Sequence, residues 1–130
     1  TEDPLHESDF DSWSSFFVKF NEKTMVVGDD LVVTNPDILE EALDKKTINA
    51  VIIKPNQVGT LTETFEFIRT AQENGLVTVV SHRSGETAED TFVSDLALAV
   101  GADFVKFGAP ARGERVVKYN RILEIYHELN

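Results

Sequence analysis

Ala50-Val51-Ile52-Ile53-Lys54 is the stretch of the chain that decides the fold. Its apolar, mostly β-branched residues predict a short strand, and the lack of alternation with polar residues indicates that both faces of the strand are buried. A strand buried on both faces is typical of a parallel sheet that is covered by helices. The stretch therefore predicts an α/β fold with Lys54 at the carboxyl end of a strand.

The same pattern recurs along the chain. Further strands are predicted at residues 24–27, 76–80 and 102–106, so that the four strands begin near residues 24, 49, 76 and 102, at intervals of 25, 27 and 26 residues. Such intervals suit right-handed crossovers in a parallel sheet or in a barrel. A closed eight-stranded barrel needs about 250 residues. The 130 residues of this chain account for about half of one.

Segments with helical periodicity separate the strands. Asn35-Pro36 predicts a helix start, because Asn caps the first amides and Pro suits the first helical position. Further helices are predicted from Thr60 to Asn74-Gly75 and from Thr87 to Gly101. In the last helix, one face is predicted to carry the apolar residues Val116, Tyr119, Leu123 and Tyr126. A second apolar stripe at helical spacing is interpreted as facing the core, and its members are Trp13, Phe16, Phe17 and Phe20.

The composition limits the class of protein. Twelve Lys and Arg against 23 Asp and Glu leave a net charge of −11, which opposes non-specific binding to nucleic acid or to an anionic membrane surface. No apolar run is long enough to span a bilayer. The absence of Cys excludes disulfides and favours a reducing compartment, so we expect a cytoplasmic protein. No linker-like segment divides the chain, and we expect one domain over residues 1–130.

Polar residues follow the predicted strands at their carboxyl ends, where βα proteins bind ligands. They are Glu2, Asp3, Asp29, Asp30, Lys54, Ser81, His82, Arg83, Ser84 and Lys106. Carboxylate oxygens are the ligands that Mg²⁺ prefers, and Lys and Arg suit an anionic substrate. A lysine crowded by a metal and by other cations can act as a base towards a carbon acid. The pattern therefore favours chemistry through an enolate.

Each of these residues also has an ordinary structural interpretation. Asp29 and Asp30 can cap a helix or brace a loop, and Asp30 is expected to do so. Lys54 and Lys106 can be solvated ends of strands, and His82 can be a hydrogen-bonded structural residue. Their equivalent positions in successive units favour the functional interpretation.

Five motifs run along the whole chain. They are Glu2-Asp3-Pro4, then Val27-Gly28-Asp29-Asp30-Leu31 with Thr34-Asn35-Pro36, then Lys54 with the loop Asn56-Gln57-Val58-Gly59-Thr60, then Ser81-His82-Arg83-Ser84-Gly85-Glu86-Thr87, and Lys106 with Gly108-Ala109-Pro110. Together they resemble the C-terminal part of enolase, the phosphopyruvate hydratase of glycolysis. The resemblance implies a fold of successive βα units that form about half of a (β/α)8 TIM-type barrel. It also implies a lyase that dehydrates 2-phosphoglycerate to phosphoenolpyruvate.

The resemblance implies roles for individual residues. Glu2 and Asp29 would be ligands of Mg²⁺, and Lys54 would be the base that removes the proton from C2 of the substrate. Substrate binding is implied for Ser81, His82, Arg83, Ser84 and Lys106, with Arg83 and Ser84 on the phosphate and Lys106 at the carboxylate end. The physical logic agrees, because metal ions and cationic side chains stabilise the charge of an enolate intermediate.

Parts of the family's pattern are absent or altered. Its third carboxylate ligand, its general-acid Glu and its mobile-loop Ser have no counterpart here, so we expect a fragment that is inactive alone. Pro55, Ala88 and Phe107 depart from the pattern, with Phe107 adding bulk near the expected site. These departures favour an alternative, a non-catalytic enolase-derived module that binds a phosphorylated acid or a protein partner.

Open sheet edges predict a homo-oligomer or pairing with the missing half of the barrel. No nucleic acid or membrane partner is expected. Another superfamily member with a different acid substrate is disfavoured by the Ser81–Thr87 loop, which resembles the part of enolase that is particular to a phosphate-bearing substrate.

Overall fold

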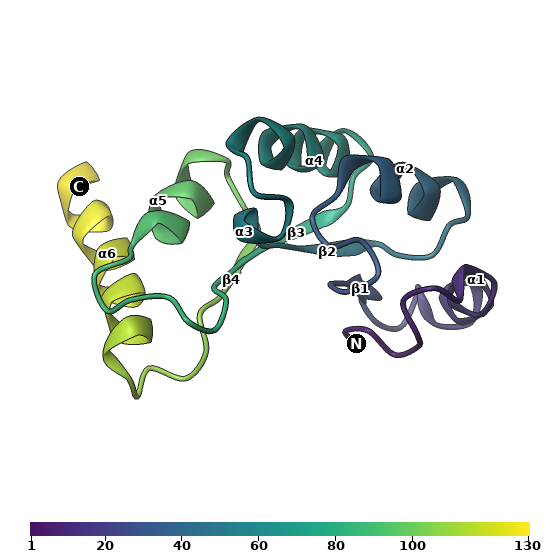
Figure 1. Ribbon diagram of the computed structural model, residues 1–130, viewed down its shortest axis with the longest axis horizontal. Helices are drawn as coiled ribbons and strands as arrows, with labels where there is room; N and C mark the ends of the chain where they lie inside the picture. The colour runs from purple at the N-terminus through teal and green to yellow at the C-terminus, as the bar shows by residue number, and fades with distance from the viewer. The chain divides into compact units, whose positions relative to one another are not determined.

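The computed structural model describes all residues from 1 to 130, and helices alternate with strands along the chain (Figure 1). The chain divides into two compact units, Thr1–Thr78 and Val79–Asn130. The strands follow one another in the order β1-β2-β3-β4, and β3 (Val77–Ser81) passes from the first unit into the second. Strand β1 pairs with β2 in parallel, and β3 pairs with β4 in parallel, which confirms the predicted α/β class. None of the helices combines the length and the hydropathy needed to cross a lipid bilayer.

The first unit contains two paired strands and four helices. Its elements are α1 (Phe10–Phe20), β1 (Val27–Gly28), α2 (Pro36–Asp44), β2 (Ala50–Ile53), α3 (Pro55–Val58) and α4 (Leu61–Glu73). The four residues of β2 are all buried, as the apolar run predicts. β1 is shorter than predicted, and its Val27 lies beside Ala50 of β2. Glu2 forms a parallel bridge with Val27, so the N-terminal segment runs along β1.

Local sequence signals account for most of the helix ends in this unit. The Asn35 side chain accepts hydrogen bonds from the amides of Asp37 and Ile38 at the start of α2, which confirms the predicted cap. Residues 55–58, expected to form a loop, form the short helix α3. The reason is that Pro55 occupies its first turn, while Gly59 ends it at a φ of 90° that favours glycine.

The aromatic stripe of α1 faces the core only in part. Trp13 is fully buried, and its indole N–H donates to the carbonyl of His6 at 3.0 Å. Phe16, Phe17 and Phe20 remain partly exposed. The core of the unit is completed by apolar side chains of α2, β2 and α4, among them Leu39, Ala42, Val51, Ile53, Phe67 and Ile68.

The second unit contains the end of β3 and the elements α5 (Phe92–Ala99), β4 (Phe104–Lys106) and α6 (Gly113–Leu129). Val79 lies beside Phe104 and Ser81 beside Lys106 in a parallel register. The predicted helix start at Thr87 is wrong, because α5 begins only at Phe92. Residues 87–91 form turns instead, and the Asp90 carboxylate accepts a hydrogen bond from the Phe92 amide.

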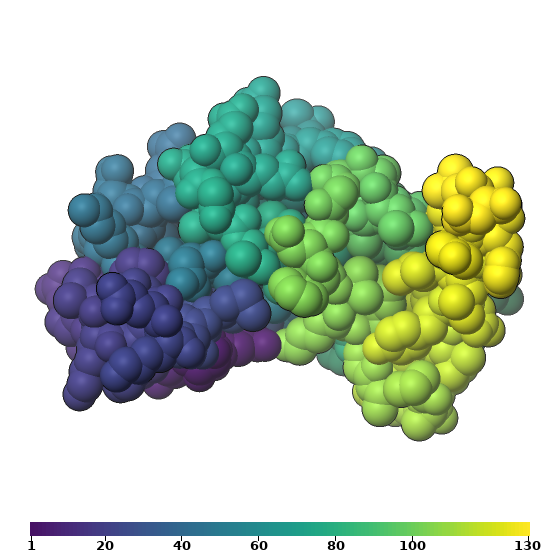
Figure 2. Space-filling view, turned by 180° about the vertical axis from the view of Figure 1, so that it is seen from behind, coloured from purple at the N-terminus to yellow at the C-terminus, as the bar shows by residue number.

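The predicted apolar face of the C-terminal helix is exposed in its C-terminal half, whereas Val116 and Tyr119 are half-buried. Leu123 and Tyr126 are 57% and 59% exposed, and the C-terminal turns of α6 lie at the surface in Figure 2, where they are yellow. The only buried residue of α6 is Lys118. All three residues of β4 are exposed as well, so this unit has an uncovered strand and an uncovered helix face.

Candidate functional site

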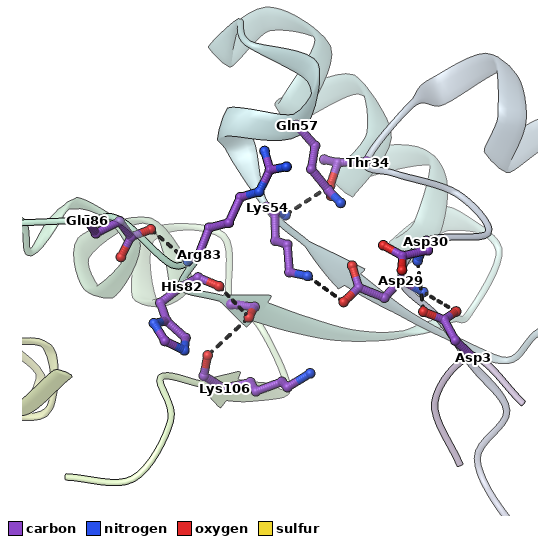
Figure 3. Close-up of polar contacts among 11 residues, drawn as sticks. Asp3, Asp29, Asp30, Thr34, Lys54, Gln57, His82, Arg83, Glu86 and Lys106 are labelled. Atoms are coloured by element: carbon purple, nitrogen blue, oxygen red, sulfur yellow. Dashed lines mark hydrogen bonds and ion pairs between the residues drawn. The ribbon is translucent and has the colours of Figure 1, made fainter. Parts of the chain in front are cut away.

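The structure joins Lys54 and Asp29 in an ion pair. Asp29 directly follows β1 and Lys54 directly follows β2, so the parallel pairing of the two strands places both residues at neighbouring carboxyl ends. Lys54 Nζ donates to Asp29 Oδ2 at 2.5 Å (Figure 3). The two side chains are only 16% and 6% exposed. The predicted base and one predicted metal ligand therefore lie in direct contact.

Asp3 fixes the loop that carries Asp29. Its carboxylate accepts hydrogen bonds from the amides of Asp29 at 3.0 Å and of Asp30 at 2.9 Å (Figure 3). Asp30 is braced through its backbone, while its exposed side chain has a pKa raised by partial burial and by the charges of Asp29 and Asp3. From the sequence, Asp3 is one of the polar residues expected at strand ends, but no role is predicted for it. The sequence signal for a role of Asp3 is its position next to Glu2 in the first motif.

Three carboxylates form a cluster in the first unit. Oxygen atoms of Glu2, Asp3 and Asp29 all lie within 4.8 Å of one another. Oδ1 of Asp29 is buried and has no hydrogen-bond partner, although a buried carboxylate oxygen ordinarily has one. Carboxylate oxygens at this spacing, one of them unsatisfied, fit a hard cation such as Mg²⁺. Glu2 and Asp29 were predicted as ligands, and Asp3 is the third member.

The backbone of Lys54 is held by Thr34 and Gln57, for which the sequence predicts no role. The amide of Lys54 donates to Thr34 Oγ1 at 2.9 Å, and this hydroxyl donates to Gln57 Oε1 at 2.9 Å. Thr34 is fully buried. Both residues occur in the quoted motifs, but only their contacts show that they fix the position of Lys54.

In the second unit, Ser81 and Lys106 end the paired strands β3 and β4. Ser81 is buried, and its Oγ lies 2.9 Å from the His82 carbonyl and 3.1 Å from the Lys106 carbonyl, so that the two carbonyls share its single O–H donor. The His82 amide also donates to the Lys106 carbonyl at 3.1 Å. The structure therefore brings Ser81, His82 and Lys106 together, and the Ser81 hydroxyl ties the strand ends to one another.

The surroundings of His82 lower its pKa and so favour the neutral imidazole. Partial burial lowers its pKa, and the positive charges of Arg115, Lys118 and Lys106 act in the same direction, against the opposing effect of Glu86. A neutral imidazole offers one N–H donor and one acceptor. It can therefore hydrogen-bond a ligand without adding a charge.

Arg83 and Ser84 lie exposed in the loop after β3, beside a hollow of about 270 Å³. The hollow is lined by His82, Arg83, Ser84, Gly85, Glu86, Ala88, Arg112, Glu114 and Arg115. The Arg83 amide donates to Glu86 Oε1 at 2.9 Å, which closes the loop on itself. Three guanidinium groups line the hollow, and that of Arg112 pairs with Glu114 at 2.9 Å. Guanidinium groups suit an anionic ligand.

The three departures from the enolase pattern have different surroundings. Pro55 starts α3 and leaves Lys54 extended, with φ of −130°. Phe107 is fully buried and packs edge-on against Tyr119, with ring centroids 5.5 Å apart, so its bulk belongs to the core of the second unit. Ala88 lines the hollow, and nothing in the structure explains its presence.

Comparison with known proteins agrees with this arrangement. Residues 1–130 match the family described as enolase, C-terminal TIM barrel domain. The chain belongs to the enolase family. It is 53% identical over 128 residues to an enolase of Elusimicrobium minutum and 53% identical over 127 residues to an enolase of Sulfurisphaera tokodaii, in each case over 98% of this chain. The chain spans 30% of the length of each of these enolases. The predicted enolase resemblance and TIM-barrel class are thereby confirmed.

Proposed function

We propose that this chain supplies the base and the substrate-holding loop of an enolase-type site that dehydrates 2-phosphoglycerate to phosphoenolpyruvate. The observation that carries the proposal is the contact of Lys54 with Asp29 at the carboxyl ends of two paired strands. This contact places a lysine beside a carboxylate cluster in a chain that matches the enolase barrel throughout. The cytoplasmic location expected from the sequence stays a prediction.

Lys54 is proposed to take the proton from C2 of the substrate onto Nζ. A base must present a neutral amine, so Lys54 has to release its proton and its contact with Asp29 before it acts. Its backbone remains held by Thr34 during this change. The backbone would stay in place while the side chain moves, so Nζ would swing about a fixed anchor.

Glu2 and Asp29 are the residues that would hold Mg²⁺, in a cluster with the carboxylate of Asp3. The metal, when bound, would neutralise the charge that develops on the substrate carboxylate as the proton leaves. Asp3 has a second task, because both of its oxygens already accept backbone amides. We therefore propose Glu2 and Asp29 as the principal ligands, with Asp3 orienting the loop.

The loop after β3 is proposed to hold the substrate. Arg83 and Ser84 are exposed and free to meet a phosphate, and a guanidinium can bind phosphate through two hydrogen bonds. His82 would add a neutral hydrogen bond, and Lys106 would contact the carboxylate end. Ser81 acts through the backbone, since its hydroxyl fixes the strand ends on which His82 and Lys106 stand.

A chimera tests the proposal with the rest of an enolase present. Residues 1–130 replace the matching segment of the Elusimicrobium minutum enolase, and phosphoenolpyruvate formation is followed by ultraviolet absorbance with and without Mg²⁺. We expect Mg²⁺-dependent turnover that falls by a factor of roughly 10²–10⁴ on Lys54→Ala. Lys45→Ala, which removes an exposed lysine paired with Glu41, is the matched control and should leave turnover unchanged.

The same assay separates the proposal from its alternative. A folded chimera that binds 2-phosphoglycerate but produces no phosphoenolpyruvate would contradict the catalytic proposal and favour a non-catalytic module. The isolated 130-residue chain is expected to show turnover near background, because three functional groups of the family's pattern have no counterpart in it. Turnover of the isolated chain near that of the chimera would contradict the expectation that it is inactive alone.

A further inference from the structure

We propose that Lys118 is a positioning residue, which holds the substrate loop of the second unit in place through Glu86. The role of that loop in binding a phosphorylated acid rests on the function proposed above. The inference itself concerns how α6 controls the loop. The sequence predicts no role for Lys118 or Glu86.

Lys118 is the one residue that α6 buries, and its side chain has no exposed surface. Its ammonium lies 2.8 Å from Glu86 Oε2 and donates to the Glu114 carbonyl at 2.8 Å. Burying an ammonium is unfavourable unless it is paired, and an apolar side chain of similar length would avoid that cost. The presence of a lysine at this position is therefore better explained by the ion pair that its ammonium forms with Glu86 than by packing.

Glu86 connects this charge to the loop. One of its carboxylate oxygens meets Lys118, and the other accepts the Arg83 amide at 2.9 Å. Both oxygens of one carboxylate are thus used, one towards α6 and one towards the loop. Because Arg83 carries the guanidinium proposed to meet the phosphate, the chain of contacts ends at the residue whose position matters most.

The other end of the chain of contacts is anchored on packed helices. Ser94 of α5 is buried, and its hydroxyl donates to the Lys118 carbonyl at 2.9 Å. The backbone of Lys118 is therefore fixed by two helices before its side chain reaches Glu86. A site is more precise when its loop is held by rigid elements.

The loop has few other means of staying ordered. Arg83, Ser84 and Gly85 are exposed, so apolar burial does not hold them. Without the carboxylate contact the loop would have to be ordered each time a ligand binds, which weakens affinity. The contacts of Glu86 and Lys118 order the loop before any ligand binds.

Hydrogen exchange of the Arg83 amide tests the inference without any ligand. In the full chain, Lys118→Met is expected to raise the exchange rate of this amide roughly tenfold, because the carboxylate that accepts its hydrogen bond loses its partner. Arg121→Met is the matched control, since Arg121 also joins α6 to α5 by pairing with Asp95 but does not contact the loop. In the Arg121→Met chain, the exchange rate of the Arg83 amide should stay within about twofold of the rate in the parent chain.

Glu86→Gln keeps the test valid if Lys118→Met fails to fold. The amide has one acceptor oxygen where the carboxylate has two, so it cannot serve both Arg83 and Lys118, and faster exchange is again expected. Unchanged Arg83 exchange in a folded Lys118→Met or Glu86→Gln chain would overturn the inference. An equal increase in the Arg121→Met control would overturn it too, because the effect would then be general loosening of α6.

Binding separates this inference from the proposed function. In the chimera, Lys118→Met is expected to weaken 2-phosphoglycerate binding by roughly tenfold, while Arg121→Met leaves it unchanged. A chimera that does not bind 2-phosphoglycerate would count against the proposed function, and the exchange result would still decide the role of Lys118. Strong binding by Lys118→Met would overturn the positioning role alone.

Discussion

Asp3 shows how much a single carboxylate contributes at the residue scale. It accepts two amides of the loop after β1, and it lies in the carboxylate cluster with Glu2 and Asp29. Asp3→Asn leaves one acceptor oxygen for two amides, so we expect a loss of about 1–2 kcal/mol in the free energy of unfolding. Urea denaturation measures this change in the free energy of unfolding. Asp37→Asn, at an exposed carboxylate in the first turn of α2, is the control and should cost less.

His82 gives a pH dependence at the same scale. Its pKa is lowered in the folded protein, chiefly by partial burial. The unfolded chain therefore binds a proton more readily, and stability present above the unfolded pKa of about 6.5 is lost as pH falls through it. We expect the urea midpoint to fall less between pH 7.5 and 5.5 in His82→Gln than in the parent chain. An identical fall in both would contradict the assignment.

At the scale of elements, α6 supports the segment that follows β4. Gly108 has a φ of 75°, and a Cβ there would lie 3.0 Å from Cδ of Arg115. Gly108→Ala is therefore expected to lower the free energy of unfolding by more than the roughly 1–2 kcal/mol that a non-glycine residue in a left-handed conformation costs by itself. Gly75→Ala is the matched control, because Gly75 has a φ of 70° with open space around it. Equal changes in melting temperature for the two variants would contradict a role for the Arg115 contact.

At the scale of the whole molecule, the second unit leaves apolar surface uncovered. Phe104 of β4 and Leu123 and Tyr126 of α6 are each more than half exposed. Exposed apolar surface and an open strand favour association, so we expect the chain to self-associate at micromolar concentration. Leu123→Glu should shift sedimentation towards monomer, whereas Val18→Glu on α1 should not. A parent chain that sediments only as monomer would contradict this prediction.

The sequence by itself determined the class of the fold and where most elements lie. The buried run Ala50–Ile53 and the cap at Asn35 depend on residues within a few positions of one another, and the structure confirms both. The candidate residues Asp29 and Lys54 were also found, because βα units place functional side chains after the strands. Periodicity, capping and strand ends are local properties, so they can be read along the chain.

Only the tertiary structure decided which groups meet. Lys118 looks like a polar position on an exposed helix, yet it is buried against Glu86, 32 positions earlier in the chain. The bracing of Asp29 by Asp3 and of Lys54 by Thr34 likewise joins residues 26 and 20 positions apart. The start of α5 at Phe92 was missed, because residues 87–91 are not helical and the Asp90 carboxylate accepts the Phe92 amide just before the helix. Such contacts depend on how strands and helices pack, and no local pattern in the sequence encodes the partner of a buried charge.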